Sequence, residues 1–204
     1  DHKFGWIASW LVNEHNSQLT KTTKISEATI VLDPGHGGSD SGALSSKGKM
    51  EKTYTLRVAK AVAKKLRTAG AHVVLTRDSD EYVGLSARPA IANKLHADAF
   101  ISFHFDSSPE KNTASGITTY YYHKSTSLAL AKALNNNVST LPIPSKGTDF
   151  GDFLVIRDNS RPSVLMELGY INDKSDFKTI SSKKYPQEVA HAVYAGLSTY
   201  FANQ

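Results

Sequence analysis

The stretch TIVLDPGHGGSDSGA, from Thr29 to Ala43, joins a β-branched apolar run to a loop in which one histidine is surrounded by glycines. The apolar run has the composition of a short buried strand. Glycine permits positive φ angles and close approach of the backbone, so the loop can direct His36 inward and leave space beside it. We therefore expect a strand that ends in a functional loop.

Strand-like and helix-like segments alternate after this stretch. Helical spacing of apolar residues predicts helices over 56–66, 128–134 and 189–201, with Gly70 ending the first. The expected strands are TIVLD (29–33), AHVVLT (71–76), AFISFH (99–104), ITTYYY (117–122), DFLVI (152–156) and SVLMELG (163–169). Strands separated by helices predict an α/β fold with a largely parallel or mixed sheet that is covered on both faces.

Composition sets limits on the classes of protein and of site. The chain of 204 residues is 40% hydrophobic and 21% charged, which suits one main domain with a substantial core. The net charge of +5 favours polyanionic surroundings, either nucleic acid or an anionic cell wall. The lysines are scattered without an arginine-aromatic stripe, so we expect no nucleic-acid partner. Without cysteine, any metal must take histidine or carboxylate ligands, and no apolar run is long enough to span a bilayer.

Four polar side chains stand where an open α/β sheet gathers its functional groups, at the carboxyl ends of strands. His36 follows the first strand, Glu51 opens the next helix, His104 ends AFISFH, and Glu167 lies near the end of SVLMELG. Two imidazoles and one carboxylate, with a position left open to water, are a recurrent catalytic zinc set that makes amide hydrolysis feasible. Glu167 would then be the general base, its pKa raised by apolar neighbours.

Each of these residues also has a structural explanation. The PGHGG segment can be an ordinary turn, His104 a hydrogen-bonded core histidine, and Glu51 a carboxylate favoured by the helix dipole. Glu167 can form a buried salt bridge with Arg157 or Arg161. The remaining histidines are expected to be structural or at the surface: His2, His15, His72, His96, His123 and His191. A phosphate-binding loop is disfavoured because no GK[ST] follows the glycines.

The combined pattern resembles the zinc-dependent N-acetylmuramoyl-L-alanine amidases of the type 3 class, which remodel bacterial cell walls. The resemblance covers about residues 28–200 and rests on IVLDPGHGGSDSGA, Glu51, VVLTRDSDEYVGLSAR, ANKLHADAFISFH and FLVIRDNSRPSVLMELGYIND. It implies that His36, Glu51 and His104 bind one catalytic Zn²⁺ and that Glu167 is the catalytic glutamate. It further implies a three-layer αβα sandwich with a mixed, mostly parallel twisted sheet of about six strands. The substrate implied is peptidoglycan, cut between the muramic-acid lactyl group and L-alanine.

The resemblance also sets expectations for the ends and for control. DHKFGWIASWLV at the start resembles the last strands of a bacterial SH3-like domain, so we expect residues 1–27 to be a remnant of that domain plus a linker, and 28–204 to be the catalytic domain. The short segment after His104 leaves no room for the inserted helix that plugs the active site in some relatives. Control by an activating protein partner, by localisation or by a missing part of the chain is expected instead.

Several alternatives stay open on the sequence alone. A zinc peptidase cutting within the stem peptide would use the same chemistry, and a wall-binding module could be inactive without a partner. Asp106 departs from the asparagine or small residue often found there in the family. The three tyrosines at 120–122 and Lys146 could line a substrate groove or pack in the core. The expected location is extracytoplasmic, in the cell envelope or secreted, with the parent protein anchored to the membrane through a missing N-terminal segment.

Overall fold

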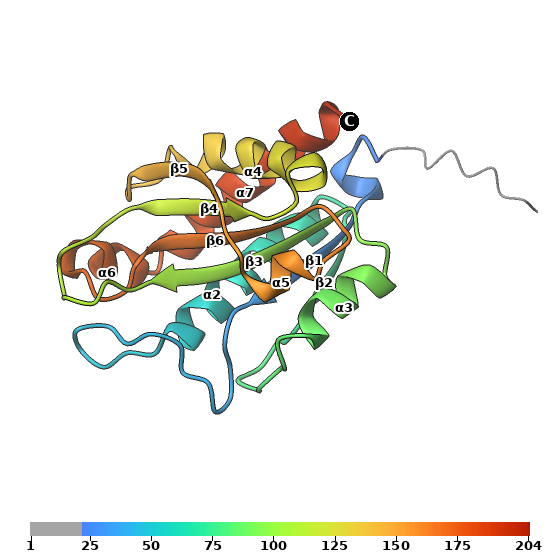
Figure 1. Ribbon diagram of the computed structural model, residues 1–204. Helices are drawn as coiled ribbons and strands as arrows, with labels where there is room; N and C mark the ends of the chain where they lie inside the picture. The colour runs from blue at the N-terminus through green and yellow to red at the C-terminus, as the bar shows by residue number, and fades with distance from the viewer. Residues whose placement is uncertain (1–21) are drawn as a thin grey trace, which may run out of the picture.

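A six-stranded sheet forms the centre of the computed structural model, which describes residues 22–204 (Figure 1). The strands are β1 (Thr29–Pro34), β2 (His72–Leu75), β3 (Ala99–Asp106), β4 (Ile117–Tyr121), β5 (Ser145–Phe150) and β6 (Ser163–Tyr170). Their order is β2-β1-β3-β6-β4-β5. The strands β2, β1, β3 and β6 run parallel to one another. The strands β4 and β5 are parallel to each other and run in the opposite direction. The predicted mixed, mostly parallel sheet of about six strands is confirmed.

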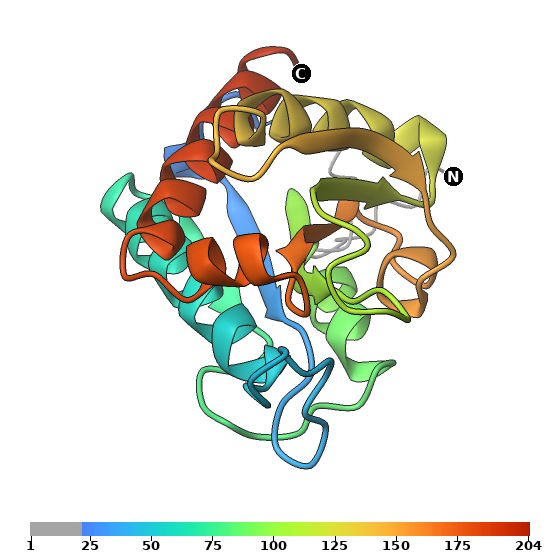
Figure 2. The same cartoon turned by 90° about the vertical axis from the view of Figure 1, so that its left-hand side faces the viewer.

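Helices cover both faces of the sheet, as Figures 1 and 2 show. One face carries α2 (Glu51–Thr68), α4 (Lys124–Val138) and α7 (Tyr185–Ala202), with the short α6 (Lys174–Ile180) at its end. Within residues 22–204, the other face carries α3 (Ala87–Lys94) and α5 (Leu154–Arg157). A short 3₁₀ helix, η1 (Ile25–Glu27), precedes β1. The predicted three-layer αβα sandwich is therefore confirmed, with one helical layer much smaller than the other.

The smaller layer determines where side chains can remain accessible. Val31, Phe100 and Leu165 pack under α3 and α5. His104 lies four residues after Phe100 and Glu167 two residues after Leu165, so both face the same side of the sheet. Since α3 and α5 are short, this face carries polar side chains where the larger layer's face carries a continuous apolar core.

The strand predicted at 152–156 is wrong, and β5 lies earlier in the chain. Residues 154–157 form the helix α5, which buries Val155 and Ile156 in the smaller core. The strand is instead SKGTDF at 145–150, an edge strand that pairs with β4 and whose single large apolar residue, Phe150, is exposed. Edge strands commonly carry charged residues in place of an apolar face, so β5 lacks the alternation that reveals a strand in sequence.

The N-terminal prediction falls mainly outside the described part of the chain. The SH3-like remnant was expected within residues 1–27, and only 22–27 belong to the structure described, where η1 leads into β1. Within residues 22–204, none of the helices combines the length and the apolar composition that crossing a membrane requires.

Candidate metal centre

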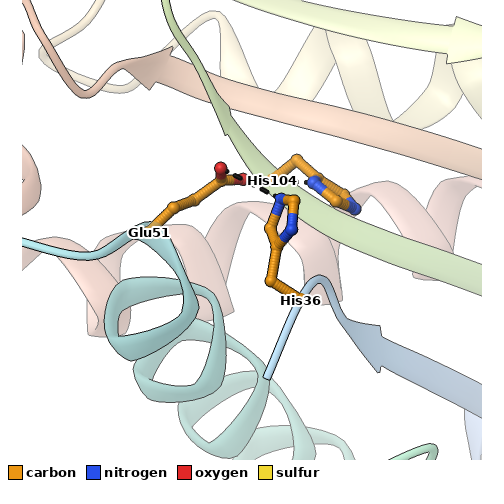
Figure 3. A group of neighbouring side chains, drawn as sticks. All are labelled: His36, Glu51 and His104. Carbon is orange, nitrogen blue, oxygen red and sulfur yellow. Dashed lines mark hydrogen bonds and ion pairs between the residues drawn. The ribbon is translucent and has the colours of Figure 1, made fainter. Parts of the chain in front are cut away.

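Three of the predicted residues meet at the end of the sheet (Figure 3). His36 comes from the loop after β1, Glu51 is the first residue of α2, and His104 lies on β3. One ligand atom from each lies within 4.8 Å of the others. The Glu51 carboxylate is shared, with Oε2 3.0 Å from His36 Nε2 and Oε1 3.1 Å from His104 Nδ1. The fold thus brings together side chains that are up to 68 positions apart in sequence.

The glycines of the loop make this close approach possible. A Cβ atom on Gly35 would lie 2.3 Å from the imidazole of His104, and one on Gly42 would lie 2.6 Å from both Glu51 and His36. Gly42 also has a φ of +63°, and His36 itself has a φ of +60°, which is unusual for a residue with a side chain. Strained backbone of this kind is held in place by its surroundings and is typical of functional sites.

Glu51 is held as a buried carboxylate. It is 3% exposed, and it accepts backbone hydrogen bonds of 2.9 Å from the N–H groups of Ala43 and Phe105. Burial by itself raises the pKa of Glu51, but hydrogen bonds and charge from His104 and His36 outweigh it and hold this pKa well below its usual range. The centre therefore contains a fixed negative charge between two imidazoles.

Asp40 orients His36 from the side opposite Glu51. Its Oδ2 lies 2.9 Å from His36 Nδ1, which leaves Nε2 turned toward the cluster. Burial lowers the pKa of His36, but the Glu51 carboxylate and then that of Asp40 outweigh burial and raise it. A carboxylate on the second ring nitrogen is the usual support of a metal-binding histidine. The sequence analysis missed Asp40, although a carboxylate four residues after His36 in the same loop was the available signal.

Glu167 lies beside this cluster with an unpaired oxygen. It is the direct register partner of His104 on the neighbouring strand. Its Oε2 is buried and has no hydrogen-bond partner among the described residues. The alternative salt bridges are not formed, because Arg157 pairs with two exposed carboxylates of its own segment and the Nε of Arg161 donates to a backbone carbonyl.

The surroundings of Glu167 favour its protonated form. Burial is the largest cause that raises the pKa of Glu167 well above its usual range, and the charges of Glu51 and Asp106 raise it further. Asp106, the residue that departs from the family pattern, thus acts on this carboxyl through its charge. A carboxyl group that readily holds a proton next to a cluster that could hold a metal has the properties of a general base and acid.

Two buried arginines hold the loop that carries His36. Arg88 Nη2 donates to the carbonyl of His36 at 3.0 Å, and Arg77 Nη2 donates to that of Gly35 at 2.8 Å. Each arginine is 2% exposed, and Arg88 forms an ion pair of 2.9 Å with Asp33, which is fully buried. The sequence analysis missed this support, because its partners lie more than 40 positions apart.

The other sequence candidates lie away from the cluster or take part in packing. His123 Nε2 contacts a backbone carbonyl, His191 is exposed on α7, and His72 and His96 are outside the group that could hold a metal. His2 and His15 lie outside the described residues. Tyr120 packs edge-on against Phe153, and Lys146 Nζ lies 3.2 Å from the hydroxyl of Tyr170, so no substrate contact follows from their geometry alone.

The donor set fits a zinc ion. Two imidazoles and one carboxylate are the protein ligands of a common catalytic zinc arrangement, which leaves a further position for water or substrate. The neighbouring unpaired Oε2 of Glu167 adds a group that can act on that water. A carboxylate on the second nitrogen of His36 completes the support that such sites require.

Replacing Asp40 with asparagine is expected to weaken zinc binding by about 10- to 100-fold, because the second ring nitrogen of His36 loses its anionic partner. Chelator competition followed by fluorescence would measure the affinity. Asp78→Asn is the matched control. Asp78 is exposed, and its substitution removes the same charge from a neighbouring loop without touching His36. Equal zinc affinity in the Asp40→Asn variant and the unaltered protein would contradict the orienting role of Asp40.

Comparison with known proteins gives a consistent result. The N-acetylmuramoyl-L-alanine amidase family profile matches residues 30–199. The probable cell wall amidase LytH of Staphylococcus epidermidis is 39% identical over 204 residues, covering 98% of this chain and 68% of that protein. The structure of the amidase AmiC2 of Nostoc punctiforme is 37% identical with a TM-score of 0.81, covering 85% of this chain and 97% of that one. The CwlD amidase of Clostridioides difficile, solved in complex with the GerS lipoprotein, is 26% identical with a TM-score of 0.79, covering 87% and 100%.

Proposed function

Because this chain belongs to the N-acetylmuramoyl-L-alanine amidase family and is a peptidoglycan amidase, we propose that His36, Glu51 and His104 hold one catalytic zinc ion and that Glu167 is the catalytic residue. The bond cleaved is the amide between the lactyl group of N-acetylmuramic acid and the L-alanine of the stem peptide. The observation that carries the proposal is the cluster of three ligand atoms within 4.8 Å beside the unpaired Oε2 of Glu167.

The chemistry divides between the metal and Glu167. Zinc, when bound, supplies the positive charge that lowers the pKa of water to about 7 and polarises the carbonyl of the amide. Glu167 accepts the proton of the attacking water at Oε2, since this oxygen has no other partner. The same carboxyl then donates that proton to the nitrogen of L-alanine as the C–N bond breaks, which returns Glu167 to its ionised form.

The alternatives from the sequence are less well supported. A peptidase that cuts within the stem peptide would use the same donor set, but the chain belongs to a family named for the lactyl amide. A non-catalytic binding module would have no need of an unpaired carboxyl beside a complete set of ligands, because burying such a group costs free energy.

Digestion of purified peptidoglycan by the zinc-loaded protein is expected to release free stem peptides that begin with L-alanine and to leave the glycan strands intact. Mass spectrometry of the soluble products would establish the cleavage position. Fragments cut inside the peptide would assign the chain to the peptidase class. Bound zinc without any product would show that the chain requires a partner or only binds the wall.

The setting of the enzyme follows from its relatives. Homology to cell wall amidases implies action outside the cytoplasm. Since the CwlD amidase was solved with a lipoprotein, we also propose an activating protein partner for this chain. We also propose that residues 1–27 are an SH3-like remnant plus a linker and that residues 28–204 are the catalytic domain. Two further proposals are that the parent protein is anchored at the membrane and that zinc is the physiological metal.

A further inference from the structure

A row of cations runs along the outer side of α2, away from the metal centre. Arg57, Lys60, Lys64 and Arg67 are separated by three, four and three residues, which places them on one side of the helix. Lys183, just before α7, lies beside the same row, and Figure 2 shows α2 and α7 side by side. We call these five residues the α2 basic strip. Successive cations along α2 are about 5 Å apart along the helix axis.

The cations of the α2 basic strip have no ion-pair partner in the part of the chain that the structure describes. Among residues 22–204, none of the five cations lies within ion-pair distance of a carboxylate. Lys60, Lys64, Arg67 and Lys183 are exposed. Surface cations without acidic partners repel one another, and this repulsion is relieved when an anion binds along the row.

The strip is hollowed and partly fixed in position. Arg57, Lys60, Lys64 and Lys183 line a shallow hollow of about 400 Å³ between α2 and the start of α7. A second hollow, of about 440 Å³, continues past Lys60 and Lys64 to Arg67, and Asp78 is the single acidic residue lining either of the two. Arg57 donates to the carbonyl of Ser182 at 3.0 Å and stacks over Tyr54 at 5.4 Å, so less of its freedom is lost when it binds an anion.

The lining of the strip identifies the kind of polyanion. Proteins that bind single-stranded nucleic acid combine cations with exposed aromatic side chains for base stacking, and helices that lie on membranes expose large apolar residues beside their cations. The two hollows contain neither, because their remaining lining consists of alanine, proline, glutamine, threonine and one leucine. Recognition therefore rests on the cations and on the polar side chains of Gln187 and Thr68, which suits a flexible chain of closely spaced phosphates without bases or acyl groups.

We propose that the α2 basic strip binds a linear polyol-phosphate polymer of the cell wall. Only Glu51, at the start of α2, reaches the metal centre, and Glu167 and His104 face the opposite side of the sheet from the helix body. A polymer bound along α2 thus leaves the proposed catalytic face free for peptidoglycan. The strip would hold the enzyme next to glycan strands that carry such polymers and away from strands that lack them.

The test is a binding assay with lipid-free poly(glycerol phosphate), using the Glu167→Gln chain so that binding is independent of turnover. The triple variant Lys60→Gln, Lys64→Gln, Lys183→Gln is expected to bind at least about tenfold more weakly at low salt. In a plot of the logarithm of the binding constant against the logarithm of the salt concentration, its slope is expected to be smaller in magnitude by about two. This is the change expected when three phosphate contacts are lost. The matched control is Lys94→Gln, Lys132→Gln, Lys178→Gln, which removes three exposed lysines on α3, α4 and α6 and should bind as the parent does.

The outcomes separate this proposal from the proposed function. Equal affinity of the triple variant and its control, or no binding by the parent, would overturn the strip as a polymer site even if the enzyme is active. Tighter binding to a single-stranded oligonucleotide of equal charge, or to vesicles of phosphatidylcholine with phosphatidylglycerol, would overturn the choice of partner. With catalytic Glu167 restored, the triple variant should keep the parent's turnover on soluble, polymer-free fragments, which shows that it is folded.

Discussion

Replacing Glu167 with glutamine is expected to reduce kcat by about 10²- to 10⁴-fold while zinc remains bound. Glutamine keeps the shape of the side chain but cannot accept the proton of the attacking water. The three proposed ligands are untouched, so metal content measured by plasma mass spectrometry should stay near that of the unaltered protein. His36→Ala is the matched comparison, because it should lose the metal itself. The reverse pattern, with metal lost from Glu167→Gln and kept by His36→Ala, would overturn both assignments.

The same variant provides a second readout in the metal-free protein. The folded state raises the pKa of Glu167, with burial as the main cause, so the folded chain holds this proton more tightly than the unfolded chain. The resulting stability is present below the unfolded pKa and is lost as the pH rises through the folded pKa. As the pH rises above about 4.3, the ordinary pKa of a glutamate side chain, the metal-free parent should therefore lose stability relative to Glu167→Gln. The measurement is the melting temperature of each chain as a function of pH. An equal change in melting temperature for the two chains would contradict the buried, unpaired state of the carboxyl.

Replacing Asp33 with alanine is expected to destabilise the fold by about 3–5 kcal/mol. The Asp33 carboxylate is fully buried and accepts hydrogen bonds from Arg88 at 2.9 Å, from Ser102 at 2.7 Å and from Thr76. Removing it leaves the buried guanidinium of Arg88 without its counter-charge. A loss of this size is a large part of the total stability of a small domain, which is about 5–15 kcal/mol.

Urea denaturation of the metal-free protein would measure this loss. Arg157→Ala is the control, because it removes two surface ion pairs, with Asp152 and with Asp158, and should cost less than about 1 kcal/mol. Asp33→Ala should also weaken zinc binding, since the arginine that loses its partner donates to the carbonyl of His36. A destabilisation no larger than that of the control would show that water or a rearranged side chain replaces the carboxylate.

Much of the candidate site could be predicted because it follows local rules. His36 follows the end of an apolar strand, His104 and Glu167 lie near the carboxyl ends of two others, and parallel strands bring such ends to one edge. Glu51 is the first residue of a helix whose apolar residues are regularly spaced, so its position at the start of that helix could also be predicted. The strands that are buried on both faces, such as β1 with Val31 in one cluster and Leu32 in the other, were found by composition alone.

Other features could not be predicted, because their partners are distant in sequence. The pairing of Asp33 with Arg88 spans 55 positions, and the hydrogen bond of Arg77 to Gly35 spans 42. Asp40 is a partial exception, because its carboxylate stands only four positions after His36 in the same loop and was a signal that the sequence offered. The raised pKa of Glu167 depends on its burial and on the charges of Glu51 and Asp106, which are 116 and 61 positions away in sequence.

The sequence by itself determined the α/β layers, the family and the side chains that form the candidate centre, because periodicity and strand-end position are properties of short segments. Only the tertiary structure decided that β4 and β5 run against the other strands and that 154–157 is a helix. It also decided that the five cations of the α2 basic strip lie together with no carboxylate of residues 22–204 within ion-pair distance. Strand direction at an edge and the absence of a counter-charge depend on what packs alongside, which is a property of the whole fold.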